Sequence, residues 1–454
     1  MSSLPLLNPF HWGYNGTVKQ HIGEDGTVPL KLKQSNERIS LQQFLSDNVS
    51  GLRDNAKFQL NPRLFTGILQ TLYLSTADFS KKFPVFYGRE IITYSDNGVS
   101  TADWVKTEWP QRYNFDPITG RFDREKFNED ERLTHPVDWP RLHPRTRYLN
   151  EQELQEVHED STRPLVIVMH GLAGGSHEPI IRSLTQELSQ VSGGKFHVVV
   201  LNTRGCARSK ITSPKLFSAF ATSDLRELVK REKERNPTRK IFCVGFSFGA
   251  TMLSNYLGEA GDDSLLDAAA VLCNPWDLVL SAHKMNDDFW SRTLFSKAIA
   301  QFLTRTVKVN MKELEYKEGE DEKSQYQPSV EHPSNKVFTK ENLKKAYNFK
   351  STLEFDSTYT APGLGFNSAL EYYHAAGSIH RLPSIRVPTL IINSKDDPVV
   401  GEASIPVKVA KENKNVILCE TDLGGHLSYL DSNKDSWATK QISQFFDKFE
   451  ELVE

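Results

Sequence analysis

Residues 240–257, KIFCVGFSFGATMLSNYL, decide the fold of this chain. The apolar run 241–244 leads directly into Gly245-Phe-Ser247-Phe-Gly249, after which apolar residues recur at helical spacing. This order predicts a strand, a sharp turn and a helix. In such a turn the glycines leave room where a Cβ would collide with a neighbouring element, and the serine takes a positive φ that exposes its Oγ. A chance match in a flexible loop would lack the flanking strand and helix, so the pattern predicts a nucleophilic serine.

Strands and helices alternate on both sides of this stretch. Apolar or amphipathic patterns predict strands at 164–170, 198–201, 268–273, 387–393 and 416–419, and helices at 180–188, 216–233 and 437–452. The first of these strands, PLVIVMH, is an unbroken apolar run of the kind that is buried on both faces of a parallel sheet. The alternation predicts an α/β chain with a doubly wound, mostly parallel sheet.

The pattern divides the chain into four segments. Residues 1–80 form an N-terminal arm and helix, 81–274 the first part of the core, 275–385 a mainly helical insertion, and 386–454 the second part of the core. An insertion between two core strands, over the carboxyl edge of the sheet, is the usual place for a lid.

Smaller elements are predicted within these segments. They are a helix at 41–44, a helix at 64–80, a hairpin of 83–94 with 99–105, a solvated surface excursion at 109–160, a helix at 290–303 and a loop or disordered stretch at 312–335.

A nucleophilic serine needs a base and an acid that orients the base, in the chain order Ser, Asp, His for this turn. Asp396 and Asp397 follow the strand predicted at 387–393, after Ser394 and Lys395. We favour Asp397, because Asp-Pro-Val-Val matches the usual order of acid, any residue and two apolar residues. Asp396 remains the alternative, with a turn-capping role otherwise. His426 follows two glycines after the next strand, and we expect it to be the base.

Two backbone N–H groups are predicted to bind an oxyanion. One is that of Phe248 at the start of the helix, and the other is that of Leu172 in the glycine-rich loop 170–175, HGLAGG. His170 at the start of this loop is expected to brace it by hydrogen bonds rather than to catalyse. Asp431, in the pattern H-x4-D with His426, is expected to precede the final helix without a catalytic role.

Two arginines, Arg204 and Arg208, lie in the loop after the strand at 198–201. They suit either an anionic group such as a phosphate or structural salt bridges, and we favour the salt bridges.

Composition narrows the function further. A net charge of −3 over 454 residues gives no electrostatic argument for nucleic-acid binding. The four cysteines, Cys206, Cys243, Cys273 and Cys419, are too widely spaced to form metal-ligand pairs, so we expect buried free thiols in a reducing compartment. We expect neither a metal nor a cofactor.

Neither a secretory signal nor a membrane span is predicted. The N-terminus lacks a basic segment followed by a long apolar run, and no run approaches the roughly 18 apolar residues that cross a bilayer. The nearest is 64–74, LFTGILQTLYL, which we interpret as a core helix, with a helix lying on a lipid surface as the alternative.

Several stretches resemble a known family. They are NPFHWGYNGTV, FPVFYGREI, HGLAGGSHEPIIRSL, NTRGCARSK, VGFSFGATMLSNYLGE, NPWDL, INSKDDPVVG and TDLGGHLSYLD. Over nearly the whole chain they resemble the yeast medium-chain fatty-acid ethyl-ester synthase/esterase proteins, acyl-CoA:ethanol O-acyltransferases within the YheT-like α/β-hydrolases. The resemblance implies an α/β-hydrolase fold and a triad of Ser247, Asp397 and His426 that makes and hydrolyses ethyl esters.

The substrates implied are acyl-CoA and ethanol, with acyl-CoA as a substrate and not a cofactor. The resemblance also implies an intracellular enzyme, cytoplasmic or in peripheral contact with a lipid droplet or the mitochondrial outer membrane surface. Some relatives are monoacylglycerol lipases, so a monoacylglycerol lipase or general carboxylesterase is the alternative. A non-catalytic, lipid-binding member of the fold is a more distant one, because such proteins typically lose a triad residue.

Overall fold

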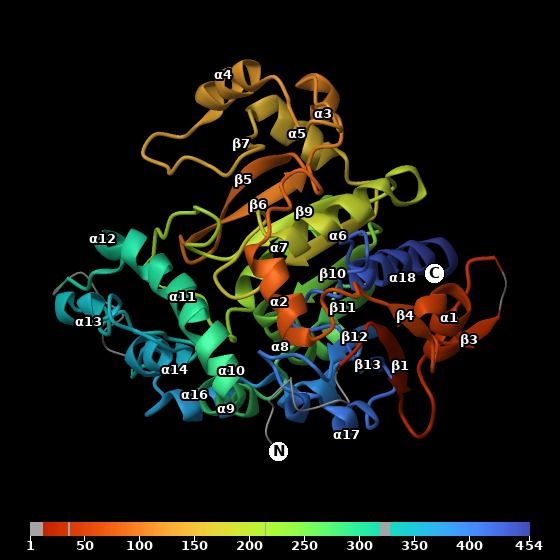
Figure 1. Ribbon diagram of the computed structural model, residues 1–454. Coiled ribbons are helices and arrows are strands. Elements are labelled where there is room, and N and C mark those ends of the chain that lie inside the picture. The colour runs from red at the N-terminus through yellow and green to blue at the C-terminus, as the bar shows by residue number, and fades with distance from the viewer. Residues whose placement is uncertain (1–11, 35–36, 214, 318–326) are drawn as a thin grey trace.

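The computed structural model describes residues 12–34, 37–213, 215–317 and 327–454. Within these residues an eleven-stranded sheet runs through the centre of the molecule (Figure 1). Its order is β4 (Lys57–Gln59), β1 (Asn15–His21), β13 (Val416–Thr421), β12 (Thr389–Ser394), β11 (Ala268–Leu272), β10 (Ile241–Phe246), β8 (Leu165–Met169), β9 (His197–Asn202), β6 (Val99–Val105), β5 (Tyr87–Thr93) and β7 (Thr146–Tyr148). The strands from β13 to β9 are all parallel, which confirms the predicted doubly wound sheet.

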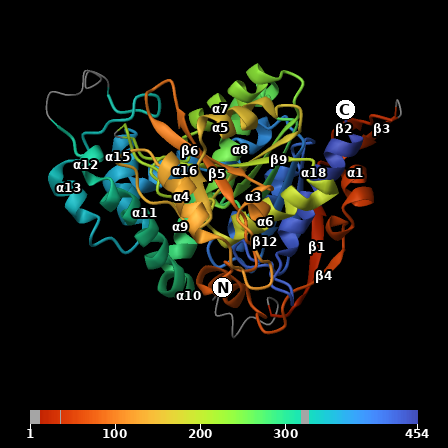
Figure 2. The same ribbon diagram turned by 90° about the horizontal axis from the view of Figure 1, so that it is seen from above.

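Helices cover both faces of the sheet (Figure 2). One face packs against α1 (Leu41–Asn48), α6 (Pro179–Gln190) and α18 (Trp437–Leu452), and the other against α5 (Glu151–Glu159), α7 (Ser223–Arg235), α8 (Phe248–Ala260) and α17 (Val407–Ala410). Successive side chains of a strand point to opposite faces, so Val168 of β8 joins the first layer and Ile167 the second. Since both layers are apolar, the central strands are the unbroken apolar runs that the sequence contains.

The connection between β11 and β12 is helical and lies on one side of the sheet, at the left of Figure 1. It contains α9 (Leu278–Asp287), α10 (Phe289–Ser291), α11 (Lys297–Val309), α12 (Met311–Leu314), α13 (Lys340–Lys345), α14 (Thr352–Phe355), α15 (Ala361–Gly363) and α16 (Ala369–Ala376). A π-helical turn, Arg292–Ser296, joins α10 to α11, so the helix predicted at 290–303 is present and longer. The predicted loop at 312–335 includes 318–326, which lie outside the described residues.

The N-terminal segment is more ordered than an extended arm. Strand β1 pairs antiparallel with β13 and with β4 at the edge of the sheet. A two-stranded sheet of β2 (Pro29–Lys31) and β3 (Arg38–Ser40) precedes α1, and α2 (Gly67–Thr76) lies within the helix predicted at 64–80. None of the described helices combines the length and hydropathy that crossing a bilayer requires.

The segment 109–160 is a mainly exposed or half-buried excursion, as predicted, but it has more regular structure than its sequence indicates. The segment forms α3 (Trp109–Arg112), α4 (Arg124–Thr134), the sheet strand β7 and α5, at the top of Figure 1. A small aromatic cluster of Phe86, Trp109, Tyr113 and Phe127 holds these elements together. Buried Arg147 lies 3.9 Å from the ring centre of Trp109 and is ion-paired. This core consists of four aromatic rings and one buried arginine, which come from several short elements. Because each element contributes only one or two of these residues, none shows a helical or strand periodicity in the sequence.

Candidate active site

Ser247 occupies the sharp turn between β10 and α8. Its φ of 51° and ψ of −118° lie outside the regions that L-residues favour, as the sequence predicts. A Cβ at Gly245 would lie 2.6 Å from Ala250 Cα, and one at Gly249 would lie 2.4 Å from the carbonyl oxygen of His170. Both glycines are therefore required by close packing, which leaves Ser247 partly exposed above the sheet.

The structure brings together the three side chains that the sequence proposes as a triad. Nε2 of His426 lies 2.9 Å from Oγ of Ser247, and its Nδ1 lies 2.8 Å from Oδ2 of Asp397. The other oxygen of Asp397 accepts the backbone N–H groups of Val399 and Val400 at 2.8 and 2.9 Å. Because the Asp397 side chain has no solvent exposure and each oxygen is hydrogen-bonded, the carboxylate is held in one orientation towards the imidazole.

Asp396, the alternative acid, has a different position. Its Oδ1 accepts the backbone N–H of Gly425 at 2.8 Å and the hydroxyl of Ser394. Burial raises the pKa of its carboxyl to about 7, with a further contribution from the negative charge of Asp397. Asp396 thus connects the loop that carries His426 to Ser394 at the end of β12, and it forms no hydrogen bond with the imidazole of His426.

The two backbone groups predicted as oxyanion donors flank Ser247. Phe248 is the first residue of α8, where N–H groups have no intrahelical acceptor. Leu172 follows Gly171, at which a Cβ would lie 3.6 Å from that of Ser247. Neither Leu172 nor Phe248 donates its backbone N–H to another residue that the structure describes.

His170 braces the loop that carries Leu172. Its Nδ1–H donates to the carbonyl of Gly171 at 2.7 Å, and its Nε2 accepts the N–H of Thr203 at 3.1 Å. Burial lowers the pKa of His170 to about 4, so the ring is neutral and suited to one donor and one acceptor role. Asp431 forms a turn before α18 and pairs with Lys440 at 3.4 Å.

The two arginines of the loop after β9 differ in their hydrogen-bond partners. Arg204 makes the predicted salt bridges, because its guanidinium donates to both oxygens of Asp96 and of Asp224. Arg208 donates to the backbone carbonyls of Arg141 and Leu142 and pairs with no carboxylate of a described residue.

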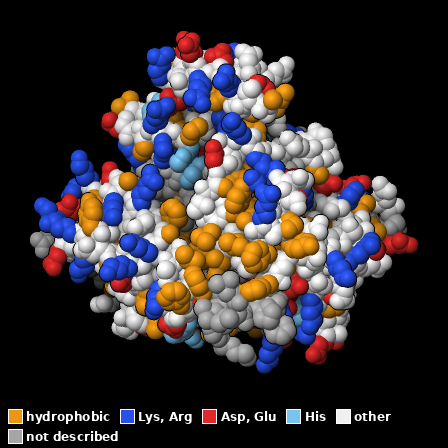
Figure 3. Space-filling view, viewed as in Figure 1, with side chains coloured by type: hydrophobic (Ala, Val, Ile, Leu, Met, Phe, Trp, Pro, Cys, Tyr) orange, Lys and Arg blue, Asp and Glu red, His pale blue; other side chains and the backbone are white. Residues whose placement is uncertain are grey.

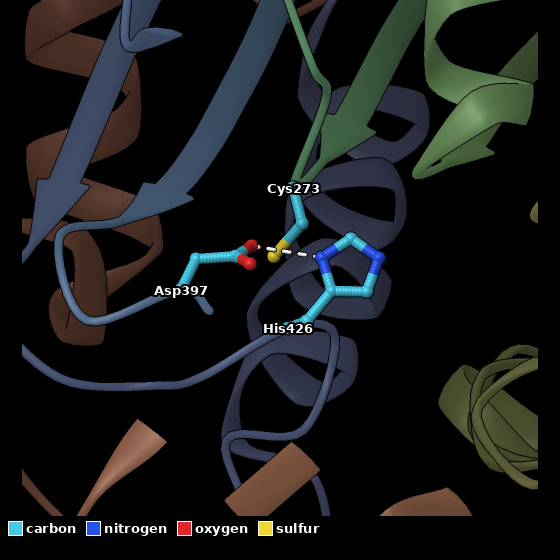
Figure 4. Close-up of side chains that lie close together, drawn as sticks. All are labelled: Cys273, Asp397 and His426. Carbon is cyan, nitrogen blue, oxygen red and sulfur yellow. Dashed lines mark hydrogen bonds and ion pairs between the residues drawn. The ribbon is translucent and has the colours of Figure 1, made fainter. Parts of the chain in front are cut away.

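Cys273, at the end of β11, lies against the acid and the base (Figure 4). Its Sγ and donor atoms of Asp397 and His426 lie within 4.8 Å of one another, a set of ligand types that can bind zinc. Zinc requires a thiolate, whereas burial and the charge of Asp397 raise the pKa of this thiol well above its ordinary value. The sulfur instead accepts the backbone N–H of Leu427 at 3.3 Å, so Cys273 fits the site as a neutral hydrogen-bonding group.

Residues of α2 also contact the His426 loop, and sequence reasoning did not assign them to the site. Thr71 Oγ1 accepts the backbone N–H of His426 at 2.8 Å. Gln70 both donates to and accepts from the backbone of Leu430. Both polar side chains are buried, while Leu72 on the same helix is partly exposed. Their signal in the sequence was the polar pair that interrupts the apolar run 64–74.

Two apolar clusters border the oxyanion donors. Leu172 packs against a cluster built mainly by α11 to α14, which includes Leu303 and Phe355. Phe248 packs against a second cluster, from α9 and α16, which includes Leu278 and Tyr372. Each of the two expected oxyanion donors therefore packs against apolar side chains, most of which come from the helical connection.

Comparisons with known proteins agree with this fold. A family model described as alpha/beta hydrolase fold matches residues 164–433. The chain is 60% identical over 453 residues to medium-chain fatty acid ethyl ester synthase/esterase 2 of Saccharomyces cerevisiae, covering 100% of this chain and 99% of that protein. It is 31% identical over 445 residues to monoacylglycerol lipase of the same yeast, covering 96% and 91%. The chain therefore belongs to the α/β-hydrolase fold family, in the group that includes the yeast medium-chain fatty acid ethyl ester synthase/esterase.

Proposed function

We propose that this protein is a serine esterase and alcohol O-acyltransferase that makes and hydrolyses medium-chain fatty-acid ethyl esters through an acyl-serine intermediate. The observation that carries the proposal is the hydrogen-bonded chain Asp397, His426, Ser247 in a protein 60% identical to a relative named for this activity. The catalytic roles of these three residues and the oxyanion roles of Leu172 and Phe248 belong to the proposal.

In the first half-reaction, Ser247 Oγ attacks the carbonyl carbon of an acyl thioester while His426 Nε2 takes its proton. Asp397 holds the Nδ1–H tautomer and stabilises the imidazolium. The backbone N–H groups of Phe248 and Leu172 bind the oxyanion of the tetrahedral intermediate. When the carbon–sulfur bond breaks, His426 returns the proton to the departing thiolate, and the acyl group remains on Ser247.

In the second half-reaction an alcohol or water takes the place of the thiol. His426 removes a proton from the acceptor hydroxyl, the acceptor oxygen attacks the acyl-enzyme, and Ser247 leaves with the returned proton. Ethanol gives an ethyl ester, and water gives a free acid. Both products use the same groups, so the ratio of synthesis to hydrolysis depends on which acceptor reaches the acyl-enzyme.

We further propose that residues 275–385 act as a lid and supply the acyl-chain site. The argument is that one apolar cluster contacts Leu172 and the other contacts Phe248, the two expected oxyanion donors next to Ser247. Phe217 packs against the first cluster, and its ring centre lies 6.0 Å from that of Phe248, which packs against the second, so Phe217 links the two surfaces. An alkyl chain between these clusters would be removed from water, at about 0.8 kcal/mol for each buried methylene. A medium chain thus gains substantial binding energy before any polar contact forms.

The proposal requires neither a metal nor a cofactor, because Ser247 and His426 supply the nucleophile and the proton transfers. We also propose an intracellular location, cytoplasmic or at the surface of a lipid droplet or the mitochondrial outer membrane. Four free, buried cysteines suit a reducing compartment.

A second candidate is monoacylglycerol lipase, favoured by the 31% identity to the yeast lipase over nearly the whole chain. It would use the same nucleophile and base, with a glycerol ester as donor and water as acceptor. The two functions differ in their donors and acceptors.

Product partition tests these proposals. Purified wild type and Ser247→Ala would receive octanoyl-CoA, or 1-octanoylglycerol, with increasing ethanol, and ethyl octanoate and free octanoate would be followed together. We expect wild type to form ethyl octanoate from octanoyl-CoA in a share that rises steeply with ethanol. Free octanoate as the dominant product at every ethanol concentration would assign an esterase, and a preference for the glyceride would assign the lipase.

The variant tests the catalytic assignment itself. Ser247→Ala should lose both activities and labelling by a fluorophosphonate probe. Equal activity in this variant would refute the role of Ser247. A folded wild type that neither turns over esters nor reacts with the probe would support the non-catalytic alternative.

A further inference from the structure

A basic cleft lies between the α4 region and the loop after β9. Its volume is about 600 Å³, within the range of ligand sites. Phe122, Phe127 and Leu142 form apolar parts of its wall. Five arginines line it: Arg124, Arg132, Arg141, Arg145 and Arg208. Figure 3 shows Lys and Arg side chains gathered over α4 and downward towards α11.

The positive charge of this cleft is not neutralised within the described part of the chain. None of the five arginines forms an ion pair there. The one acidic residue on the wall, Glu131, pairs with Nδ1 of His135 at 2.8 Å. Only Arg145 is buried, and a buried arginine rarely lacks a charged partner. The other four are exposed or half-buried, so the wall presents guanidinium groups that an anion could reach.

Arg145 gives the strongest sign of a built site. Its residue is only 6% exposed, and its Nε has no hydrogen-bond partner among the described residues. Its φ of 64° lies in the left-handed region, which costs free energy for a residue with a side chain. Burial and the charge of Arg182 lower the pKa of Arg145 to about 10. Nη2 of Arg145 donates to the backbone carbonyl of Ser80 at 2.5 Å, which is a neutral acceptor. An anion in the cleft would therefore supply the missing negative charge and offset the repulsion from Arg182.

The cleft is connected to the active site by the loop that carries Leu172. At one end of this loop, Gly171 lies against Ser247. At the other end, the ring of His177 stacks on that of His143 in the cleft wall, with centres 3.8 Å apart and planes at 5°. A Cβ at Gly175 would lie 2.4 Å from Cβ of Ala207, next to Arg208, so the two loops are in close contact.

We propose that the arginine cleft binds the phosphate groups of the acyl-CoA donor while its thioester reaches Ser247. The inference rests on the proposed function and names the part of the protein that recognises the donor. Coenzyme A carries a diphosphate and a separate phosphomonoester, and guanidinium groups bind phosphate oxygens in pairs. A flexible pantetheine arm joins these phosphates to the thioester, so phosphate site and nucleophile must be separate. Neutral glycerides carry no group that would use this cleft.

The test uses two exposed arginines whose side chains form no hydrogen bond or ion pair within the described residues, Arg132 and Arg141. Their removal in Arg132→Gln/Arg141→Gln should not disturb folding. The matched control is Arg38→Gln/Arg63→Gln, which removes two exposed arginines outside the cleft whose side chains also form no hydrogen bond or ion pair within the described residues. Thermal unfolding would verify that both double variants are folded. Arg208→Gln is a third variant, closer to the loop of Leu172.

The kinetic readout compares two donors with the same acyl group. In the cleft variant, kcat/KM for octanoyl-CoA divided by kcat/KM for p-nitrophenyl octanoate should fall at least about tenfold, mainly through KM for octanoyl-CoA. The control should keep the wild-type ratio. An unchanged ratio in both cleft variants would overturn the proposal.

Direct binding separates this inference from the proposed function. Titration calorimetry with free coenzyme A and with adenosine 3′,5′-bisphosphate should give binding that weakens at least about tenfold in the cleft variant, even if octanoyl-CoA is not turned over. Sedimentation with phosphatidylglycerol vesicles tests a lipid headgroup as the source of phosphate. Loss of vesicle binding with unchanged coenzyme A affinity would overturn the proposal in favour of lipid.

Discussion

Replacement of Asp397 by asparagine separates the two neighbouring aspartates. In Asp397→Asn the amide can keep its Oδ1 on the N–H groups of Val399 and Val400, which Asp397 holds at 2.8 and 2.9 Å, so the fold should survive. Its NH₂ group then faces Nδ1 of His426, which must accept rather than donate. The proton moves to Nε2, and the imidazole can no longer take the proton of Ser247. Such tautomer inversion lowers kcat by about 10⁴, or roughly 5.5 kcal/mol of transition-state stabilisation.

The matched control is Asp396→Asn. Because burial raises the pKa of Asp396 to about 7, the amide resembles a form that already exists at neutral pH, and its oxygen can still accept the N–H of Gly425. We expect kcat within a few-fold of wild type. Both variants would be assayed for p-nitrophenyl octanoate hydrolysis at pH 7.5, with circular dichroism to verify folding. Equal losses in two folded variants, or full activity in Asp397→Asn, would refute the assignment of Asp397.

Three further predictions concern the supports of the site. Thr71→Val leaves the buried N–H of His426 without its acceptor, so we expect the free energy of unfolding to fall by about 1–3 kcal/mol and kcat to fall as well. Thr71→Ser should recover both quantities, which urea titration and ester hydrolysis measure. An unchanged free energy of unfolding in Thr71→Val would contradict this role. Asp396 has a folded pKa of about 7, above its ordinary value of 3.8, so its contribution to stability is fully present below about pH 4 and is lost as pH rises to 7. Urea unfolding from pH 4 to 8 should therefore show wild type losing stability relative to Asp396→Asn. Parallel pH profiles of the two proteins would contradict the raised pKa. Gly249→Ala places a Cβ 2.4 Å from the carbonyl oxygen of His170, so it should lower the free energy of unfolding by at least about 2 kcal/mol. Urea titration measures this loss. A near-neutral effect would mean that the turn relaxes around the added Cβ.

Sequence alone predicted the parts of the molecule that local pattern determines. The run 241–244 before Gly245 and the helix after Ser247 have signatures that do not depend on distant residues. The ends of parallel strands meet at one edge of a sheet, so the positions of Asp397 and His426 after core strands indicated that they approach Ser247. A preference for Asp397 over Asp396 rested on a short motif, and the structure places Asp397 against the imidazole and Asp396 against the backbone.

What the sequence could not predict depends on contacts between distant segments. Arg204 and Arg208 are four residues apart in one loop, yet one meets Asp96 and Asp224 while the other meets only backbone carbonyls. Trp109 and Tyr113 form a core only because α4 and β7 return to them. The polar face of α2 is buried because the backbone groups of His426 and Leu430 bond to it. No local sequence pattern predicts these distant partners.

The pairing of β1 with β13 has a consequence for synthesis of the chain. The backbone N–H of Thr17 bonds to the carboxylate of Asp422, which lies 405 residues further along. Strand β1 therefore cannot pair with β13 until nearly the whole chain has been translated. By contrast, β8 to β11 can pair while the ribosome is still at work. Such long-range closure makes assembly of this edge slow. Since the loops bearing Asp397 and His426 follow β12 and β13, a nascent chain that stops before β13 would hold its central strands and yet remain inactive.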